Sequence, residues 1–326
     1  MKSRRNFDNV RETLLFDRSR LVLDTLSCRK HLLNISDILP IRPVKKIDIN
    51  LKTVANRIKT ANKKGASVIL MIGAHVLRSG VQRYLIDLME KGFITCVAVN
   101  GAVVIHDFEF ALVGATTENV AEYIIDGRFG FWQETGRIND IVKKAADDGV
   151  GLGKAVGQVI EEEKFPYREI SILAAAYRCG CPVTVHVAIG YDIVHQHPNF
   201  DGSSWGQTSY TDFLKFAKVL ENLENGVVMN FGSAVMAPEV YLKALSMVRN
   251  IARQENRAIS MFTTLVCDLV KLPKDYSKEA ARDTADYFFR PWKTMLIRTI
   301  RDGGEGFYVR GKHAETMPQL WTAIVS

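Results

Sequence analysis

The run Ala66-Ser-Val-Ile-Leu-Met-Ile72 decides how the chain folds, because it is apolar almost throughout and lies between Gly65 and Gly73. A short apolar run bounded by glycines is typical of a strand that is buried on both faces of a parallel sheet. Residues 51–63 before it and residues 82–91 after it have the apolar spacing of amphipathic helices. The run therefore belongs to a pattern in which helices and strands alternate along the chain.

The alternation continues to residue 266. Further strands are predicted at residues 95–99, 181–187, 226–230 and 258–266, and further helices at residues 107–112, 139–147, 157–164, 170–177, 210–223 and 238–250. This pattern predicts an α/β, Rossmann-like fold, with a mostly parallel sheet and helices on both of its faces. Residues 1–50 are charged and irregular. They predict an N-terminal arm, packed on the main body or on a neighbouring subunit, ahead of a single domain over residues 51–326.

Composition and charge set limits on the function. The chain has 326 residues, of which 47% are hydrophobic and 24% charged, with a formal net charge of +7. This excess of positive charge suits an anionic partner such as a dinucleotide. The sequence has no block of basic residues that would predict nucleic-acid binding. The sequence has neither an apolar signal core nor a stretch long enough to span a bilayer, so we expect a cytoplasmic protein without membrane contact. The five cysteines form no disulfide framework and are expected to be reduced and mostly buried.

Small residues follow several predicted strands. In parallel sheets ligands bind at the carboxyl ends of the strands, where glycine allows backbone N–H groups to approach a phosphate. Gly73–Gly80, Asn100-Gly101-Ala102 and Gly232-Ser233 occupy such places. The segment 73–80 is equally consistent with a plain turn between strand and helix. Asp107, which follows His106, suits a helix N-cap, a role compatible with ligand binding.

Three other motifs contain residues with possible chemical roles. His195 and His197 are spaced like metal ligands but lack a matching carboxylate or cysteine pattern, so no metal site is predicted. Residues 149–154 contain a G-x-G-x-G run that follows no predicted strand, and we interpret it as a flexible loop. Lys293 follows Pro291 and Trp292. In an apolar setting its amine pKa would fall and make it a nucleophile, whereas the alternative is an ordinary surface lysine.

From residue 50 to 326 these pieces resemble, in order and spacing, the deoxyhypusine synthase family. The resemblance rests on residues 72–107, Ser171–Tyr177, Gly190-Tyr-Asp192, residues 226–233 and Trp292-Lys293. It implies NAD as cofactor and a reaction in which spermidine is dehydrogenated and its aminobutyl group is carried on a lysine as an imine. It also implies a homotetramer with active sites across subunit boundaries.

The departures from the family pattern point to its bacterial deoxyhypusine synthase-like branch. Of the acidic substrate loop only Asp192 clearly survives, and Ala237-Pro238 replaces a Lys-His pair whose histidine handles the substrate proton. In place of that histidine, His106, His313 or His195 could act as the base. Trp and Lys are adjacent here, whereas the family usually separates them by a glycine.

The resemblance gives a set of expected site residues. Lys293, His106 and His313 are the expected catalytic residues. Asp192, Asp268, Trp205 and Trp292 are expected to bind a cationic substrate. The residues expected to hold NAD are Gly73, Ser79, Gly80, Asn100, Gly101, Ala102, Asp107, Gly232 and Ser233.

The predicted function is NAD-dependent transfer of an aminoalkyl group from a polyamine such as spermidine, through an imine on Lys293. Two alternatives stay open. One is a protein that keeps the fold and binds NAD or a small molecule without catalysis. The other is an amine oxidoreductase with net hydride transfer to the cofactor.

Overall fold

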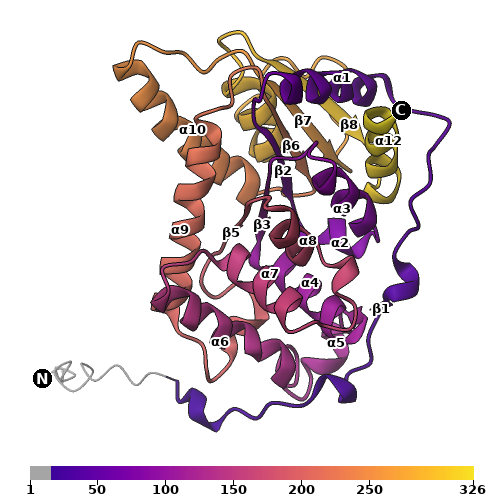
Figure 1. The fold of residues 1–326 in the computed structure, drawn as a ribbon, viewed down its shortest axis with the longest axis vertical. Coiled ribbons are helices and arrows are strands. Elements are labelled where there is room, and N and C mark those ends of the chain that lie inside the picture. The colour runs from indigo at the N-terminus through magenta and orange to yellow at the C-terminus, as the bar shows by residue number, and fades with distance from the viewer. Residues whose placement is uncertain (1–15) are drawn as a thin grey trace, which may run out of the picture.

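The computed structural model describes residues 16–326, and its centre is a six-stranded sheet in which every strand is parallel to its neighbours. The strands are β2 (Val68–Ile72), β3 (Cys96–Asn100), β5 (Val183–His186), β6 (Val227–Phe231), β7 (Thr263–Asp268) and β8 (Glu305–Arg310). Their spatial order is β5-β3-β2-β6-β7-β8 (Figure 1). Counted along the chain this is 3-2-1-4-5-6, the strand order of a Rossmann fold. The predicted fold class is confirmed.

Helices cover both faces of the sheet. The helices are α1 (Ile49–Lys63), α2 (Ala74–Arg78), α3 (Gln82–Glu90), α4 (Gly101–Val113), α5 (Val120–Tyr123), α6 (Gln133–Asp147), α7 (Leu152–Glu162), α8 (Ile172–Cys179), α9 (Gly202–Leu220), α10 (Met236–Gln254), α11 (Arg290–Lys293) and α12 (His313–Val325). In β2, Leu70 and Ile72 join the core under α1, α3, α4 and α12, whereas Ile69 and Met71 join the core under α9, α10 and α11. Both faces of this strand are therefore apolar, as the apolar run of residues 66–72 predicts.

Some predicted boundaries are wrong. Helix α4 does not start at Asp107 but at Gly101, directly after β3, because the Asn100 side chain caps it by accepting the Val103 N–H at 3.2 Å. Strand β8 and helix α12 were not predicted. Both follow a glycine-rich stretch, and β8 is a half-buried edge strand rather than a fully apolar run.

The G-x-G-x-G segment, residues 149–154, is irregular only in its first half, because Gly151 caps α7 and the helix begins at Leu152, so the interpretation of the whole segment as a flexible loop is wrong. A Cβ at Gly151 would lie 1.8 Å from a carboxylate oxygen of Asp212, and one at Gly153 would lie 2.2 Å from the Val183 carbonyl oxygen. The Asp212 carboxylate accepts the N–H groups of Gly153 at 2.9 Å and Val185 at 3.0 Å. The glycines thus allow α7 to pack directly on β5.

The described part of the N-terminal arm, residues 16–48, packs on the body of the same chain (Figure 1). Asp24 exchanges backbone hydrogen bonds with Phe131 and Gln133 at 2.9 and 2.8 Å, and Leu26 is buried against Tyr123 and Trp132. Further on, β1 (Leu33–Asn34) pairs with β4 (Ala115–Thr116). Residues 1–15 of the predicted arm lie outside the described residues.

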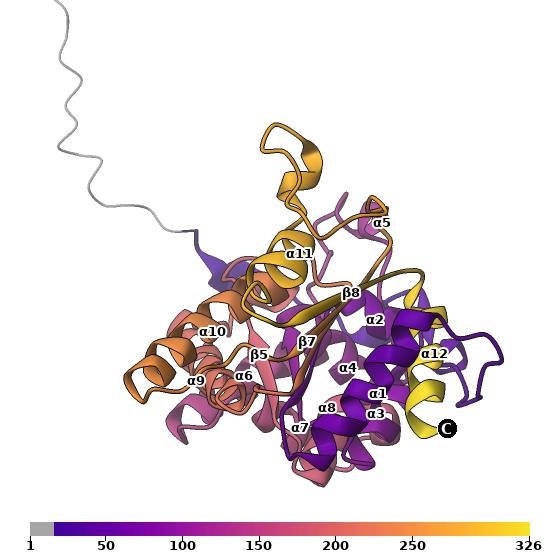
Figure 2. The ribbon, with the colours of Figure 1, turned by 90° about the horizontal axis from the view of Figure 1, so that it is seen from above.

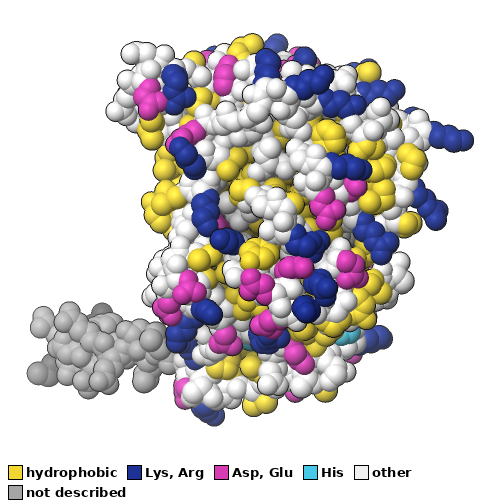
Figure 3. Space-filling model, viewed as in Figure 1, with side chains coloured by type: hydrophobic (Ala, Val, Ile, Leu, Met, Phe, Trp, Pro, Cys, Tyr) yellow, Lys and Arg dark blue, Asp and Glu magenta, His cyan; other side chains and the backbone are white. Residues whose placement is uncertain are grey.

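The surface shows two further features. The segment between β7 and α11 stands out from the body in Figure 2. On the face shown in Figure 3, basic and acidic side chains are interspersed with apolar ones. No helix among the described residues is long and apolar enough to cross a membrane.

None of the five cysteines is in a disulfide. Cys96 and Cys267 are buried, whereas Cys28 and Cys179 are exposed, so the prediction that most are buried is wrong.

Candidate functional site

The chain reverses its winding direction between β2 and β6, which lie side by side with Ile72 opposite Phe231. In open α/β sheets ligands bind at this switch point, outside the carboxyl ends of the strands. Gly73 and Gly232 follow the two strands, and a Cβ at Gly73 would lie 2.4 Å from the Gly232 carbonyl oxygen. Gly232 has a φ of 61°, and a Cβ there would lie 2.4 Å from Nε2 of His313. The absence of side chains therefore lets both loops and the start of α12 meet at one point.

A second small-residue turn lies beside the first, where β3 leads into α4. A Cβ at Gly101 would lie 2.1 Å from Oδ2 of Asp192, so the carboxylate of the loop after β5 rests on the start of this helix. Burial raises the pKa of Asp192 to about 6. The fold thus places a largely buried carboxylate on a bare helix start at the ligand-binding edge of the sheet.

A cavity of about 220 Å³ opens next to this carboxylate. Its lining comes from the arm, α2, α4, the β4–α5 loop and the loop after β5. The lining residues are Arg29, Arg78, Ala102, Ile105, His106, Glu109, Thr117, Glu118, Val120, Phe129, Tyr191, Asp192 and Ile193. Titratable groups of both signs therefore gather in this cavity.

Glu109 forms the buried floor of this charge cluster. Arg29 donates to its two carboxylate oxygens at 2.9 and 2.7 Å, and both side chains are 1% exposed. Burial opposes ionisation of Glu109, but the charge and hydrogen bonds of Arg29, with those of Thr116 and Thr135, outweigh it and hold the pKa below its usual value. The pair is therefore ionised and internally balanced.

Glu118 is a carboxylate of this cavity that the described residues leave incompletely satisfied. Its Oε1 accepts the indole N–H of Trp132 at 2.9 Å, whereas its buried Oε2 has no hydrogen-bond partner among residues 16–326. The side chain is buried, and burial raises its pKa above the usual value. A buried carboxylate oxygen without a partner is costly, so this oxygen suits a ligand that donates hydrogen bonds.

Two basic groups complete the cavity. Nδ1 of His106 lies 2.8 Å from Oγ1 of Thr116, and burial lowers the pKa of His106 to about 4, so the imidazole is neutral at pH 7. Arg78 is exposed at the rim, and its guanidinium lies 3.3 Å from Nε2 of His75. The rim therefore carries a cation that no carboxylate within ion-pair distance neutralises among the described residues.

The fold brings some of the predicted residues to this region. Asn100, Gly101, Ala102, His106 and Asp192 lie at or in the cavity.

Gly73, Gly232 and Ser233 lie at the neighbouring switch point. His313 is there too; burial lowers its pKa, and the charge of Asp268 partly opposes this effect.

Three residues that were expected to hold NAD contact other parts of the protein instead. The buried Asp107 carboxylate accepts the Ser171 hydroxyl at 2.5 Å and the Ile172 N–H at 2.9 Å, so it caps α8 rather than its own helix. Ser79 donates to the His75 carbonyl at 2.7 Å at the end of α2. A Cβ at Gly80 would lie 2.2 Å from the carbonyl oxygen of Asp37, which places this turn against the arm.

The two tryptophans have no open ring face for a cation. Trp205 is fully buried and donates its indole N–H to Asn139 at 2.8 Å. Trp292 is part of α11, is buried in the cluster that contains the apolar side of α10, and donates its indole N–H to the Tyr276 carbonyl at 2.8 Å.

Lys293 is also buried, and its Nζ lies 3.4 Å from the ring centroid of Tyr287. Helix α11 packs against α10, on the face of the sheet opposite to α4, and Lys293 does not line the cavity. The fold of one chain therefore does not bring Lys293 and His106 together.

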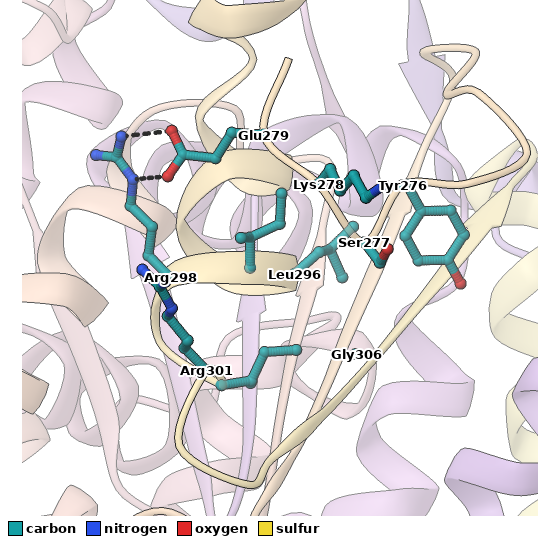
Figure 4. Close-up of a pocket in the computed structure, with 10 residues that line it drawn as sticks. Tyr276, Ser277, Lys278, Glu279, Leu296, Arg298, Arg301 and Gly306 are labelled. Carbon is teal, nitrogen blue, oxygen red and sulfur yellow. Dashed lines mark hydrogen bonds and ion pairs between the residues drawn. The ribbon is translucent and has the colours of Figure 1, made fainter. Parts of the chain in front are cut away.

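A larger hollow of about 780 Å³ lies along the edge strand β8 (Figure 4). Its wall includes the ion pair of Arg298 with Glu279, in which both nitrogen–oxygen distances are 2.7 Å. It opens beside Gly306, near the start of β8 rather than at the carboxyl ends of the strands. For this reason we take the smaller cavity as the candidate site.

Comparison with known proteins supports the fold. Residues 52–159 match the family model described as the C-terminal Rossmann-fold domain of arginine dihydrolase ArgZ-like proteins. Unliganded AgrE is similar with a TM-score of 0.51 and 13% sequence identity, over 87% of this chain and 34% of AgrE. The chain thus spans about a third of the length of AgrE. A search of curated proteins gave no match.

Two other solved structures show weaker similarity. A conserved LOR/SDH protein from Methanococcus maripaludis has a TM-score of 0.48 and 15% identity, over 87% of this chain and 71% of that protein. A protein assigned as a deoxyhypusine synthase from Entamoeba histolytica has a TM-score of 0.40 and 8% identity, over 85% and 87%. Neither similarity singles out the deoxyhypusine synthase family.

Sequence reasoning missed Arg29, Arg78, Glu109 and Glu118. His106 and Glu109 are three residues apart on one helix, which places them on the same face and is a signal that could have revealed Glu109. No local signal marks the other three, because they come from the arm, a short helix and a loop that only the fold brings together.

Proposed function

We propose that this chain binds NAD and oxidises a primary amine in the cavity between α4 and the arm. The observation that carries the proposal is the buried Oε2 of Glu118, which has no hydrogen-bond partner within residues 16–326 and lies in a cavity at the ligand-binding edge of a Rossmann sheet. An ammonium group offers the hydrogen bonds and the charge that this oxygen lacks.

The strand ends fit a dinucleotide. Gly73, Gly101-Ala102 and Gly232-Ser233 place only small side chains at three neighbouring turns, while the Asp192 carboxylate lies against Gly101 and the His313 ring against Gly232. A pyrophosphate can approach the backbone N–H groups of these turns beside those two side chains. Asn100 stands where many such sheets carry an acidic residue for the ribose. When bound, NAD would supply an acceptor for hydride. AgrE has been solved with ornithine and NAD+, which guides the choice of ligands for the tests.

The charges of the cavity favour an amino acid over a polyamine. Glu118 and Asp192 can hold an ammonium group, and the unneutralised Arg78 at the rim can hold a carboxylate. A polyamine would instead bring a second positive charge towards Arg78. Since the pKa of Asp192 is about 6, its carboxylate is ionised at pH 7 and can accept the proton that the amine must lose before oxidation.

Thermal-shift titration of the full chain tests the binding steps. We expect NAD to raise the melting temperature, and L-ornithine or L-lysine to raise it further, while putrescine and spermidine give smaller shifts. The Glu118→Gln variant should weaken amino-acid binding on the order of tenfold or more and leave NAD binding unchanged. Glu122→Gln, an exposed acid one turn along in α5, is the matched control.

Appearance of reduced cofactor with an amino acid tests the chemistry. If NAD raises the melting temperature and no amine does, the protein binds a dinucleotide but the proposed amine oxidation is wrong. No shift with either ligand would overturn the proposal.

Aminoalkyl transfer through an imine on Lys293 is the second candidate. It is favoured by the burial of Lys293 beside the Tyr287 ring, because a lysine amine sheltered from water is a better nucleophile when it loses its proton. Since the lysine lies away from the cavity of its own chain, this reaction needs the cavity of another subunit, which agrees with the expected homotetramer. Borohydride trapping with NAD and spermidine, followed by mass spectrometry, should then give an adduct on Lys293. Light scattering that shows a monomer would exclude this route.

A further inference from the structure

Five polar side chains form a connected hydrogen-bond network from the arm to the candidate cavity. Arg29 donates to both oxygens of Glu109, and Thr135 and Thr116 donate their hydroxyl hydrogens to the same carboxylate, each at 2.6 Å. Oγ1 of Thr116 lies in turn 2.8 Å from Nδ1 of His106. Except for His106, which is partly buried, every member is buried.

The direction of each hydrogen bond follows from the chemistry of the groups. An ionised carboxylate only accepts, so the Thr116 hydrogen must point to Glu109. The Thr116 oxygen then has only lone pairs to offer His106, and Nδ1 of the imidazole must carry a hydrogen. Arg29, which cannot lose its proton, keeps Glu109 in the accepting state.

The surroundings of His106 keep its ring neutral. Burial is the main reason that its pKa lies at about 4, and the positive charges of Arg78, Arg29 and His75 act in the same direction against the opposing charge of Glu109. A neutral imidazole with hydrogen on Nδ1 has a bare lone pair on Nε2.

We propose that the chain Arg29–Glu109–Thr116 fixes the tautomer of His106, so that bare Nε2 accepts a hydrogen bond from the amine bound in the cavity. His106 is then a substrate-binding residue, and Thr116, Glu109 and Arg29 are positioning residues. The tautomer is inferred from the hydrogen-bond geometry alone. The binding of an amine by Nε2 rests in addition on the proposed function. An Nε2–H tautomer would instead point a hydrogen towards the ammonium group and repel it.

Nitrogen NMR of the full chain tests the tautomer directly. The sequence contains seven histidines, so in protein labelled with ¹⁵N-histidine the His106 signals are assigned by their loss in His106→Gln. We expect a protonated Nδ1 and an unprotonated Nε2 at neutral pH. An Nε2–H signal for His106, or a mixture of both tautomers, would overturn the proposal. The tautomer itself is measured on the unaltered protein, and the variant serves only to assign the signals.

A pair of threonine variants tests the positioning role. Thr116→Val removes the hydroxyl and should populate the Nε2–H tautomer, whereas Thr116→Ser keeps the hydroxyl and should keep the original spectrum. Where an amine substrate is oxidised, Thr116→Val should raise its KM on the order of tenfold with NAD binding unchanged, and Thr116→Ser should restore it.

A fixed Nδ1–H tautomer without any amine binding would leave the tautomer standing and refute the proposed function. Equal spectra for Thr116→Val and Thr116→Ser would refute the positioning role.

Discussion

Removing the charge of Arg29 should be among the most damaging single changes in the part of the chain that the structure describes. The Arg29→Met variant keeps most of the apolar stem but leaves Glu109, 1% exposed, without its cationic partner. Breaking a buried ion pair by removing one member costs about 3–5 kcal/mol, because the other charge stays buried and uncompensated. We therefore expect the free energy of unfolding to fall by about that amount at pH 7.

The loss of stability in Arg29→Met should vary with pH, because it depends on the ionisation of Glu109. In the unaltered chain the folded pKa of Glu109 lies below its usual 4.5, so its contribution to stability is present above that value and is lost as pH falls through the folded pKa. Without Arg29, burial raises the pKa of Glu109 instead. The destabilisation of Arg29→Met should then be largest near neutral pH and smaller below the usual pKa of the carboxyl.

Urea unfolding followed by tryptophan fluorescence is a suitable assay. The Arg29 guanidinium lies 5.4 Å from the ring centroid of Trp132, so the variant also reports on local packing. Lys30→Met, which removes an exposed charge next in sequence, is the matched control and should change stability by less than about 0.5 kcal/mol. The double variant Arg29→Met/Glu109→Leu should recover much of the loss. A cost for Arg29→Met no greater than that of Lys30→Met, or no recovery in the double variant, would refute the reasoning.

Three further predictions concern other positions. Gly153→Ala should cost about 1–3 kcal/mol because its Cβ would strike a backbone carbonyl of β5 at 2.2 Å, whereas Gly206→Ala, with open space around it on α9, should gain about 0.5–1 kcal/mol in chemical denaturation. Burial raises the folded pKa of Asp212 from 3.8 to about 6, so its ionisation lowers stability as pH rises through 6, and Asp212→Asn should remove this part of the pH dependence of the melting temperature. Gly101→Ala should displace the Asp192 carboxylate, which lies 2.1 Å from the position of the new Cβ, and weaken amine binding in titration calorimetry while secondary structure by circular dichroism stays unchanged.

The sheet could be predicted from sequence because its strands are buried on both faces. Each of β2, β3 and β6 has five residues, all apolar in β2 and all but one asparagine in β3 and β6, and each leads into a small-residue turn, a combination typical of parallel sheets. The same rule failed for β8, where the residues are partly exposed and no apolar run marks the strand. It failed at the start of α4 because Asn100, not Asp107, supplies the cap.

The site could be predicted only where function follows from local position. Gly73, Gly101 and Gly232 were predicted because small residues at the ends of parallel strands suit a ligand, and the structure places them at the switch point and beside the cavity. Lys293 was singled out by the resemblance, and the fold places it on the other face of the sheet. Glu118 could not be found, because its significance lies in an oxygen without a partner, which is a property of the packed chain.

The N-terminal arm contributes residues to the candidate site, although its irregular sequence predicted a segment separate from the catalytic domain. Residues near its middle have little regular structure, yet Arg29 is buried and neutralises Glu109, and Leu26 fills a cluster with Tyr123 and Trp132. A body without this arm would keep its sheet but expose the cluster and hold a buried carboxylate without its cation. Because Glu109 orients the Thr116 hydroxyl, the same loss would also release the imidazole that faces the cavity. The segment with the least regular structure in this region therefore supplies the charge on which the polar network depends.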